Sequence, residues 1–380
     1  MKKFDLIVVS YEPFPYGKAA TNRMLSYLTG LAKEKSILYL CLASPSFDTP
    51  NKKQYGIHNE ILFRYLSNPV LKRKRLIVLR KAISLCWRYL LLIYLLFSYS
   101  TKSVLLYSSK PFLNKLVFLI CRIKKNNVFL DKTELVGYNY SKETSELLRF
   151  KNDTKKLSGL IVISPGLYDY FDNVQPEQKF LLPVLVDMSR FIHQKKEKFF
   201  FCCSGANLER DGLLDCLTGF LLFYQSRKDY VFQIASTLNL NDAYHKKCKD
   251  IIDQHPDCIQ YLGHLPSYEI PNKLSKATAL LLTPHTNYET KGFPTKLGEY
   301  LASGTPVICS SIDDLMSVIS STTAFIVSPN SPTQIAKALQ TIVDNKELAE
   351  EVGYNGSQLM QNFYTIHAYK DNLINFLKIN

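Results

Sequence analysis

The chain of 380 residues is long enough for two domains, and its apolar content of 46% excludes a disordered protein. Residues 1–190 contain 30 Lys and Arg against 14 Asp and Glu, whereas residues 191–380 contain 17 against 19. The net charge of +14 therefore comes from the first half, and residues 61–130 contain no acidic side chain at all. This asymmetry predicts that the first half meets an anionic partner.

The first half alternates predicted strands and helices. The apolar residues Met24, Leu25, Leu28 and Leu31 share one face of a predicted helix, and a second helix is expected at 113–123. Short apolar runs predict strands at 4–9, 37–42, 104–107, 128–130 and 160–163. The apolar run at 4–9 is short and contains Asp5, whereas a secretory signal would need a longer apolar region. Such alternation indicates a Rossmann-like α/β domain with a parallel sheet.

The second half repeats this plan. Strands are predicted at 199–203, 231–235, 259–262, 279–282, 307–309 and 324–327, and helices at 212–226, 331–362 and 366–377. The polar stretch 187–198 is the expected hinge. The predicted domains are residues 1–190, residues 191–362 and a crossover helix, residues 363–380, that packs back toward the first domain. In such a protein we expect a ligand in a cleft between the two halves, at the carboxyl ends of the strands.

Cysteine and histidine patterns provide no support for a metal or a cofactor. The nine cysteines include no C-x-x-C pair, and the seven histidines show no paired-ligand spacing. The sequence also lacks G-x-G-x-x-G, a P-loop and a D-x-D after an apolar strand. We therefore predict free thiols in the reducing cytosol, with neither a metal nor a cofactor.

The stretch KGFPTKLGEYLASGTPVICS, residues 291–310, is the most informative segment. A tight turn precedes a short helix that begins near Thr295, Gly304 ends this helix, and an apolar strand follows. Lys296 falls in the first turn, where the helix dipole disfavours a cation. Either this lysine is an ordinary surface residue, or an anion binds beside it.

Five segments, in this order along the chain, resemble the retaining family-4 glycosyltransferases of the GT-B fold. They are PFPYGKAATNRM (13–24), FLLPVLVDMSRF (180–191), IQYLGHLPSYEI (259–270), GFPTKLGEYLASGTPVI (292–308) and NFYTIHAYKDNLINFL (362–377). The resemblance implies two Rossmann-like domains that face a central cleft. It also implies transfer of a sugar from a nucleotide-diphosphate donor without a metal.

The resemblance assigns the donor site to residues 292–299. Gly292, Phe293, Pro294 and Thr295 open a helix whose backbone N–H groups can point at an anion. Lys296 is assigned to the donor phosphates, and Glu299 to the two ribose hydroxyls, which need a planar acceptor. The alternative for Glu299 is an ordinary exposed glutamate.

The sequence departs from the family pattern at two places. The first glutamate of the family's pair, eight residues before Glu299, is Lys291 here, which leaves the contacts to the transferred sugar open. In the loop SGANLERDG the usual arginine and lysine are replaced by Ala206 and Asp211. The phosphates are therefore expected to depend on Lys296, Lys291 and Arg210.

Two candidates lie in the first half. Gly17 lets the backbone approach the diphosphate closely, although a plain turn glycine is the alternative. Glu134 follows the strand at 128–130 and is the candidate to orient or deprotonate the acceptor hydroxyl. Asp131 beside it has the alternative role of a helix cap. In this class the leaving phosphate itself is thought to take the proton, so that a protein base need not exist.

Residues 71–99 combine basic, aromatic and aliphatic side chains. The longest uncharged run, 89–101, is too short to span a bilayer, which favours a helix lying in the interface of an anionic membrane. The membrane-side or acceptor-side candidates are Lys72, Arg73, Lys74, Arg75, Arg80, Lys81, Trp87 and Arg88. The alternative is a buried helix with a solvated basic end. Nucleic acid is not expected, because no recognisable module is present.

The leading hypothesis is a retaining, metal-independent glycosyltransferase of the hexosyltransferase type. Its acceptor would be a glycan or a polyprenyl-linked sugar, at the cytoplasmic face of a bacterial membrane, in capsule, O-antigen or similar polysaccharide biosynthesis. The alternatives are a non-catalytic GT-B scaffold subunit of a membrane assembly and a sugar-nucleotide epimerase.

Overall fold

The structure is a computed structural model that describes residues 2–17, 19–44, 51–67, 77–108, 110–133, 151–204, 208–285 and 295–380. For residues 77–82 and 313–314 it describes the backbone only. The chain forms two compact units. Unit 1 comprises the described residues up to Leu185 together with Ile366–Asn380, and unit 2 comprises those from Val186 to Thr365. The sequence placed these boundaries at 190 and 362.

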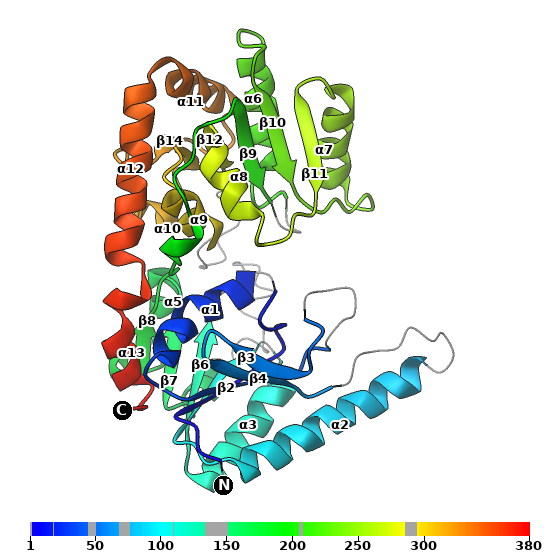
Figure 1. Cartoon of the computed structure of the whole chain (residues 1–380), viewed down its shortest axis with the longest axis vertical. Helices are drawn as coiled ribbons and strands as arrows, with labels where there is room; N and C mark the ends of the chain where they lie inside the picture. The colour runs from blue at the N-terminus through cyan, green and yellow to red at the C-terminus, as the bar shows by residue number, and fades with distance from the viewer. Residues whose placement is uncertain are drawn as a thin grey trace. The chain divides into compact units, whose positions relative to one another are not determined.

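Unit 1 is built on an eight-stranded sheet of order β3-β4-β2-β1-β5-β6-β7-β8 (Figure 1). Its strands are β1 (Leu6–Ser10), β2 (Ile37–Cys41), β3 (Tyr55–His58), β4 (Ile61–Tyr65), β5 (Ser103–Tyr107), β6 (Asn127–Lys132), β7 (Gly159–Val162) and β8 (Lys179–Leu181). Neighbouring strands are parallel except for the β3–β4 hairpin, and Leu6 of β1 pairs with both Ile37 and Ser103. Because β1, β2 and β7 are buried along their whole length, they are apolar except for Ser10 at the end of β1 and do not alternate with polar residues.

The helices of unit 1 cover its sheet. They are α1 (Ala19–Ala32), α2 (Ile77–Ser98), α3 (Pro111–Lys124), α5 (Pro165–Tyr170), α13 (Lys370–Phe376) and the 3-10 turns η1 (Pro176–Gln178) and η3 (Ile366–Ala368). Met24, Leu28 and Leu31 of α1 are buried in the core as predicted, while Leu25 lies at its edge. Within the described ranges, none of the helices combines the length and apolar character that crossing a membrane requires.

Unit 2 has a six-stranded parallel sheet of order β11-β10-β9-β12-β13-β14. Its strands are β9 (Phe199–Cys203), β10 (Val231–Ala235), β11 (Ile259–Gly263), β12 (Ala279–Leu282), β13 (Val307–Ser310) and β14 (Phe325–Val327). Its helices are α6 (Leu213–Tyr224), α7 (Ala243–Gln254), α8 (Ile270–Lys276), α9 (Thr295–Ala302), α10 (Asp313–Met316), α11 (Pro332–Asp344), α12 (Lys346–Phe363) and the turn η2 (Met188–Arg190).

Two apolar clusters fill the two faces of the unit 2 sheet. One packs α6, α7 and α11 against it, and the other packs α8, α9 and α10 (Figure 1). Alternate side chains of β9 enter opposite clusters, with Phe200 in the first and Phe201 in the second. The two Rossmann-like parallel-sheet units confirm the predicted fold class.

A buried ion pair ties α1 to the carboxyl end of β6 in unit 1. Arg23 donates from Nη2 to Asp131 Oδ1 at 3.0 Å, and its Nη1 and Nη2 also donate to the carbonyl groups of Pro183 and Leu182. The Tyr27 hydroxyl donates to Asp131 Oδ2 at 3.0 Å. Burial alone would lower the pKa of Arg23, but the charge of Asp131 raises it above its ordinary value. Asp131 is therefore an internal counterion, while the segment that it was alternatively expected to cap lies outside the described residues.

Candidate functional site

Lys296 lies at the carboxyl edge of the unit 2 sheet, in an ion pair with Asp211. Its Nζ donates to Asp211 Oδ2, and the Ser204 hydroxyl donates to the same oxygen at 2.5 Å. Ser204 follows β9 directly, whereas Asp211 comes just before α6, so that Asp211 links β9, α6 and α9. The Asp211 carboxylate is almost fully buried, while the Lys296 side chain stays 21% exposed. The lysine is thus held by a buried carboxylate, and part of its side chain remains exposed.

Glu299, one turn after Lys296 on α9, forms the second ion pair of this edge. Arg190 Nη1 donates to Glu299 Oε1 at 2.5 Å, and Arg190 Nη2 donates to the carbonyl oxygen of Ser267 at 3.3 Å. Asp187 fixes the turn η2 that carries Arg190 by accepting from the Ser189 N–H at 3.0 Å. Glu299 therefore has a fixed orientation rather than a free surface position.

Tyr300 fixes the position of α9 on the sheet. This tyrosine is fully buried, and its hydroxyl accepts from the backbone N–H of Cys203 at 2.7 Å. Burial raises the pKa of the Cys203 thiol to about 12, even though Lys296 lowers it. A thiol with this pKa is protonated at physiological pH.

Gly212 lets α6 begin against the end of β12. Its φ is +71°, and a Cβ there would lie 1.8 Å from the carbonyl oxygen of Thr283. Neither the backbone conformation nor the space admits a side chain. The glycine thereby brings Asp211 to the strand end where Lys296 is bound.

We expect Gly212→Ala to lower the free energy of unfolding by roughly 2–5 kcal/mol, because left-handed strain and overpacking add. Gly263→Ala is the matched control. Its φ is +67°, and among the described residues a Cβ there would meet no atom within 4 Å. Chemical denaturation of both variants separates the two effects. Equal losses of unfolding free energy in the two variants would show that the close contact with Thr283 adds nothing to the cost of the left-handed backbone.

The remaining predicted donor residues fall in several places. Thr295 is the first residue of α9, and Arg210 is half-buried immediately before Asp211. Lys291, Gly292, Phe293 and Pro294 lie outside the described residues.

The two unit 1 candidates differ in what the structure says of them. Glu134 also lies outside the described residues. Gly17 has a local explanation, since a Cβ there would lie 2.0 Å from Thr21 Oγ1, which donates to the carbonyl of Pro13. A donor contact by Gly17 stays a prediction.

Sequence reasoning missed the two counterions. Asp211 was noted only as a departure from the family pattern, and Arg190 was not considered for the site. These residues are 85 and 109 positions from their partners, and no local spacing marks either pairing. The one available signal was the charge of Asp211 itself, because a buried carboxylate needs a cation beside it.

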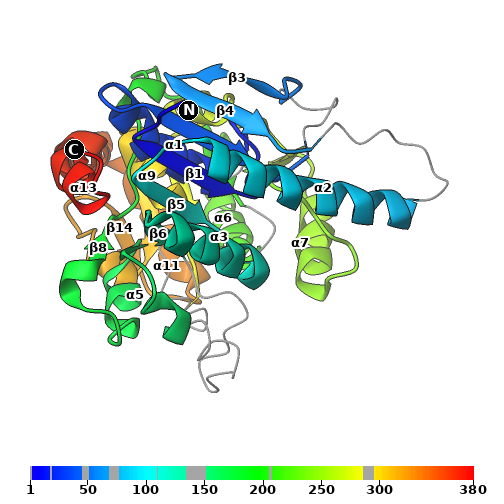
Figure 2. The same ribbon diagram turned by 90° about the horizontal axis from the view of Figure 1, so that it is seen from below.

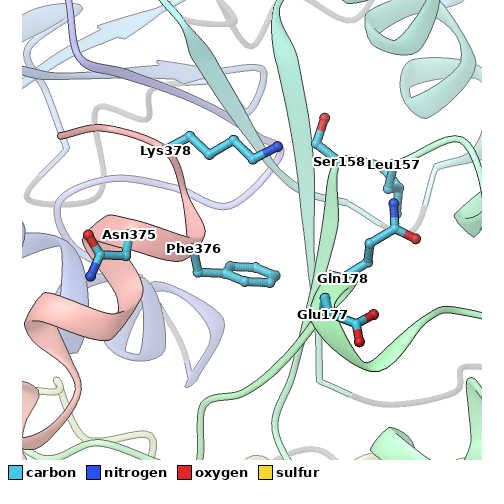
Figure 3. Close-up of a pocket in the computed structure, with 7 residues that line it drawn as sticks. All are labelled: Leu157, Ser158, Glu177, Gln178, Asn375, Phe376 and Lys378. Atoms are coloured by element: carbon cyan, nitrogen blue, oxygen red, sulfur yellow. The ribbon is translucent and has the colours of Figure 1, made fainter.

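Two other features lie away from this edge. A pocket of about 580 Å³ in unit 1 lies between α13 and the segments around β7 and η1, where Glu177 and Lys378 line it (Figure 3). Phe376 contributes an apolar side chain to its lining, and the centroid of this ring lies 5.4 Å from that of the Phe129 ring. Among the described residues, the possible metal ligands His255, Asp257 and Cys258 lie within 4.8 Å of one another, before β11. They stand at the amino end of the sheet, opposite Lys296.

Comparisons with known proteins agree with this geometry. Residues 187–359 match the family model described as glycosyl transferases group 1. The sequence matches no curated protein.

Solved structures match the fold over nearly the whole chain. Sucrose-phosphate synthase from Thermosynechococcus elongatus has a TM-score of 0.73 at 15% identity, covering 98% of both chains. Anabaena Alr3699/HepE in complex with UDP-glucose has a TM-score of 0.74 at 11% identity, covering 99% of both. A glycosyltransferase from Rickettsia africae has a TM-score of 0.69 at 12% identity, covering 99% of this chain and 98% of that one. The fold is therefore that of the GT-B glycosyltransferases, and the match to the glycosyl transferases group 1 model lies within unit 2.

Proposed function

We propose that this protein transfers a sugar, with retention and without a metal, from a nucleotide-diphosphate donor bound at the Lys296 edge of unit 2. The observation that carries the proposal is the placement of Lys296 and Glu299 one turn apart on α9, each fixed by a counterion. The matching segment, residues 187–359, contains both residues. The structure of HepE in complex with UDP-glucose provides a precedent for the donor class on this fold.

The proposed chemistry requires stabilisation of a leaving diphosphate. Breaking the anomeric C–O bond leaves negative charge on the phosphate oxygens, and a fixed cation stabilises that charge more in the transition state than in the ground state. Lys296 supplies such a cation. Its ammonium carries three N–H donors, of which Asp211 accepts one, and among the described residues no second acceptor is seen, so that the others are proposed to donate to phosphate oxygens.

Asp211 is, in this proposal, the positioning residue of the phosphate site. A flexible lysine loses side-chain entropy when it binds an anion, and a buried carboxylate that already holds the ammonium reduces that cost. Asp211 offsets part of the positive charge of Lys296, so that Arg210 and Lys291 are proposed to supply further positive charge for the diphosphate. Gly292, Phe293, Pro294 and Thr295 would contribute backbone N–H groups.

Glu299 is proposed to accept the two ribose hydroxyls. Its Oε1 accepts from Arg190, and this hydrogen bond fixes the orientation of the carboxylate plane. Arg190 is proposed as a positioning residue, because it acts through Glu299 and not on the donor.

We further propose that the acceptor is a glycan or a polyprenyl-linked sugar, in bacterial surface polysaccharide biosynthesis such as capsule or O-antigen, at the cytoplasmic face of the membrane. The basic first half supports an anionic partner of this kind. Glu134 remains the proposed acceptor-side residue.

Donor binding is tested by thermal unfolding with a panel of UDP, GDP, ADP and CMP and their sugars. A ligand that binds only the folded protein raises its stability, by about 2.7 kcal/mol at a hundred times its Kd. We expect one nucleoside diphosphate to raise the melting temperature, and Lys296→Ala and Glu299→Ala to abolish this increase. The controls are Lys337→Ala on α11 and Glu347→Ala on α12, which lie exposed in the same unit. Stabilisation by no compound would favour a non-catalytic scaffold, whereas turnover without an acceptor would favour an epimerase.

A further inference from the structure

Helix α2 exposes an apolar stripe on the side opposite its contact with unit 1. Leu92, Leu95 and Leu96 are buried in the unit. Ile83, Trp87, Leu90, Tyr94 and Phe97 recur every three or four residues on the other side, and each is exposed. A helix that is apolar on both faces is normally covered on both. We therefore expect a partner to cover the exposed stripe.

Helix α3 carries a second stripe beside the first. Phe112, Leu119 and Ile123 are exposed and fall on one face. The exposed basic residues Lys115 and Arg122 border this face. Apolar side chains edged by cations are typical of a helix that lies in a membrane interface.

The two helices are fixed to each other. The rings of Tyr89 and Phe112 meet edge to face at 5.1 Å, and Lys124 donates to the carbonyl oxygens of Leu96 and Tyr99 at 2.5 and 2.6 Å. In both views α3 runs beside the C-terminal half of α2, while the N-terminal end of α2 extends beyond the sheet of unit 1 (Figures 1 and 2). We call the two exposed stripes together the α2–α3 surface.

The charges of this region select the kind of partner. Neither α2 nor α3 contains an acidic residue, and the acid-free segment 61–130 includes fourteen Lys and Arg. Each cation near an anionic membrane contributes about 1 kcal/mol of attraction. Aromatic side chains with a polar edge, such as Trp87 and Tyr94, prefer the same interface.

The structure changes which of the predicted membrane residues take part. Arg88 turns inward, because it donates to the carbonyl oxygen of Leu42 at 2.8 Å and to Ser44 Oγ at 2.7 Å. It therefore supports the helix and is not a lipid contact. Trp87 stays on the surface at 59% exposure. Lys72, Arg73, Lys74 and Arg75 lie outside the described residues, and the side chains of Arg80 and Lys81 are likewise not described.

We infer that the α2–α3 surface docks unit 1 on an anionic lipid bilayer, with the two apolar stripes among the acyl chains and Lys115 and Arg122 at the headgroups. The inference deepens the proposed function, since it names the surface by which the enzyme would reach a lipid-linked acceptor. It does not depend on the donor site, which lies in unit 2.

The chain carries its own probe for this test. Trp87 is the sole tryptophan of the sequence and lies within the exposed stripe. On addition of vesicles that contain phosphatidylglycerol, its fluorescence is expected to shift to the blue, and brominated acyl chains are expected to quench it. Vesicles of phosphatidylcholine alone are expected to give a much smaller shift. An unchanged spectrum with anionic vesicles would overturn the inference.

Paired variants separate the surface from general effects. Leu90→Glu is expected to weaken sedimentation with anionic vesicles about tenfold or more. Leu240→Glu in unit 2 is the matched control, because Leu90 and Leu240 are both 61% exposed. Lys115→Glu with Arg122→Glu is expected to weaken binding to anionic vesicles, with Lys246→Glu and Lys247→Glu on α7 as the control pair. Equal vesicle binding by Leu90→Glu and wild type would overturn the inference.

Two further measurements distinguish lipid docking from self-association and from a defect in donor binding. If light scattering shows a dimer that Leu90→Glu dissociates, a second copy covers the surface and the lipid inference fails. Nucleotide stabilisation of Leu90→Glu is expected to equal that of the wild type. If the wild type binds nucleotide but no anionic vesicles, the lipid inference fails and the proposed function stands. If it binds anionic vesicles but no nucleotide, the proposed function fails and the lipid inference stands.

Discussion

Lys296→Ala is expected to lower the rate of sugar transfer by about 10²–10³-fold, the usual effect of removing one group that stabilises a developing anion. The loss should appear mainly in kcat, because the charge on the diphosphate grows as the bond breaks. The measurement is steady-state turnover of the sugar nucleotide that the stabilisation panel identifies. Because the truncation leaves the buried Asp211 carboxylate without its cation, thermal unfolding of Lys296→Ala is measured alongside, and turnover is compared at a temperature where both proteins are folded.

Asp211→Asn provides the decisive comparison for this prediction. An amide still fills the space and accepts from Ser204, but it no longer holds the ammonium by charge. We expect a slower enzyme in the wild-type background and no further loss in the Lys296→Ala background, because Asp211 acts through the lysine. Additive losses would give Asp211 a role of its own. Full activity of Lys296→Ala would remove the lysine from the mechanism.

Asp131→Ala is expected to lower the free energy of unfolding of unit 1 by about 3–5 kcal/mol, since it leaves the Arg23 guanidinium buried without its counterion. The Tyr27 hydroxyl loses its acceptor as well. Trp87 reports on unit 1 alone, so that its fluorescence during urea denaturation follows the affected unit even if the two units unfold separately.

The double variant Arg23→Met/Asp131→Leu is the control for buried charge. Replacing both ions by apolar groups of similar volume is expected to cost much less than Asp131→Ala alone. Glu34→Ala removes an exposed ion pair with Lys370 and should change little. If Asp131→Ala unfolds at the same urea concentration as wild type, the pair does not contribute to stability.

Apolar periodicity predicted most of the fold. Strands β9 and β10 have the bounds that the sequence predicted, because β9 is a short apolar run and β10 is apolar except for Gln233. The hairpin β3–β4 and the edge strand β8 were missed. In β4 Arg64 interrupts the apolar residues, and β8 is only three residues long and begins with Lys179, so that neither contains a long apolar run. The predicted helix 331–362 is divided at Asn345, whose side chain caps α12 by accepting from the Leu348 N–H.

The site was predictable to the extent that its motif is local. Lys296 and Glu299 belong to one segment, where helix position and dipole single out the lysine. Their counterions come from other segments of the chain, and that pairing depends on how the sheet is ordered. The direction of Arg88 was unpredictable for the same reason. It is next to Trp87 in the sequence, yet its hydrogen bonds reach the segment after β2.

The return of the C-terminal segment to unit 1 has a consequence for biosynthesis. Leu373, Leu377 and Ile379 belong to the same apolar cluster as β1 and α1, and Ser103 of β5 donates to the carbonyl oxygen of Leu377 at 2.6 Å. Unit 2 ends at Thr365, so that all of its residues are synthesised before those that complete unit 1. Unit 1, although its first strands are synthesised first, cannot complete its core until residues 366–379 have been synthesised. A chain truncated after Thr365 would therefore contain every residue of unit 2 but lack part of the unit 1 core, which reverses the usual order of domain maturation.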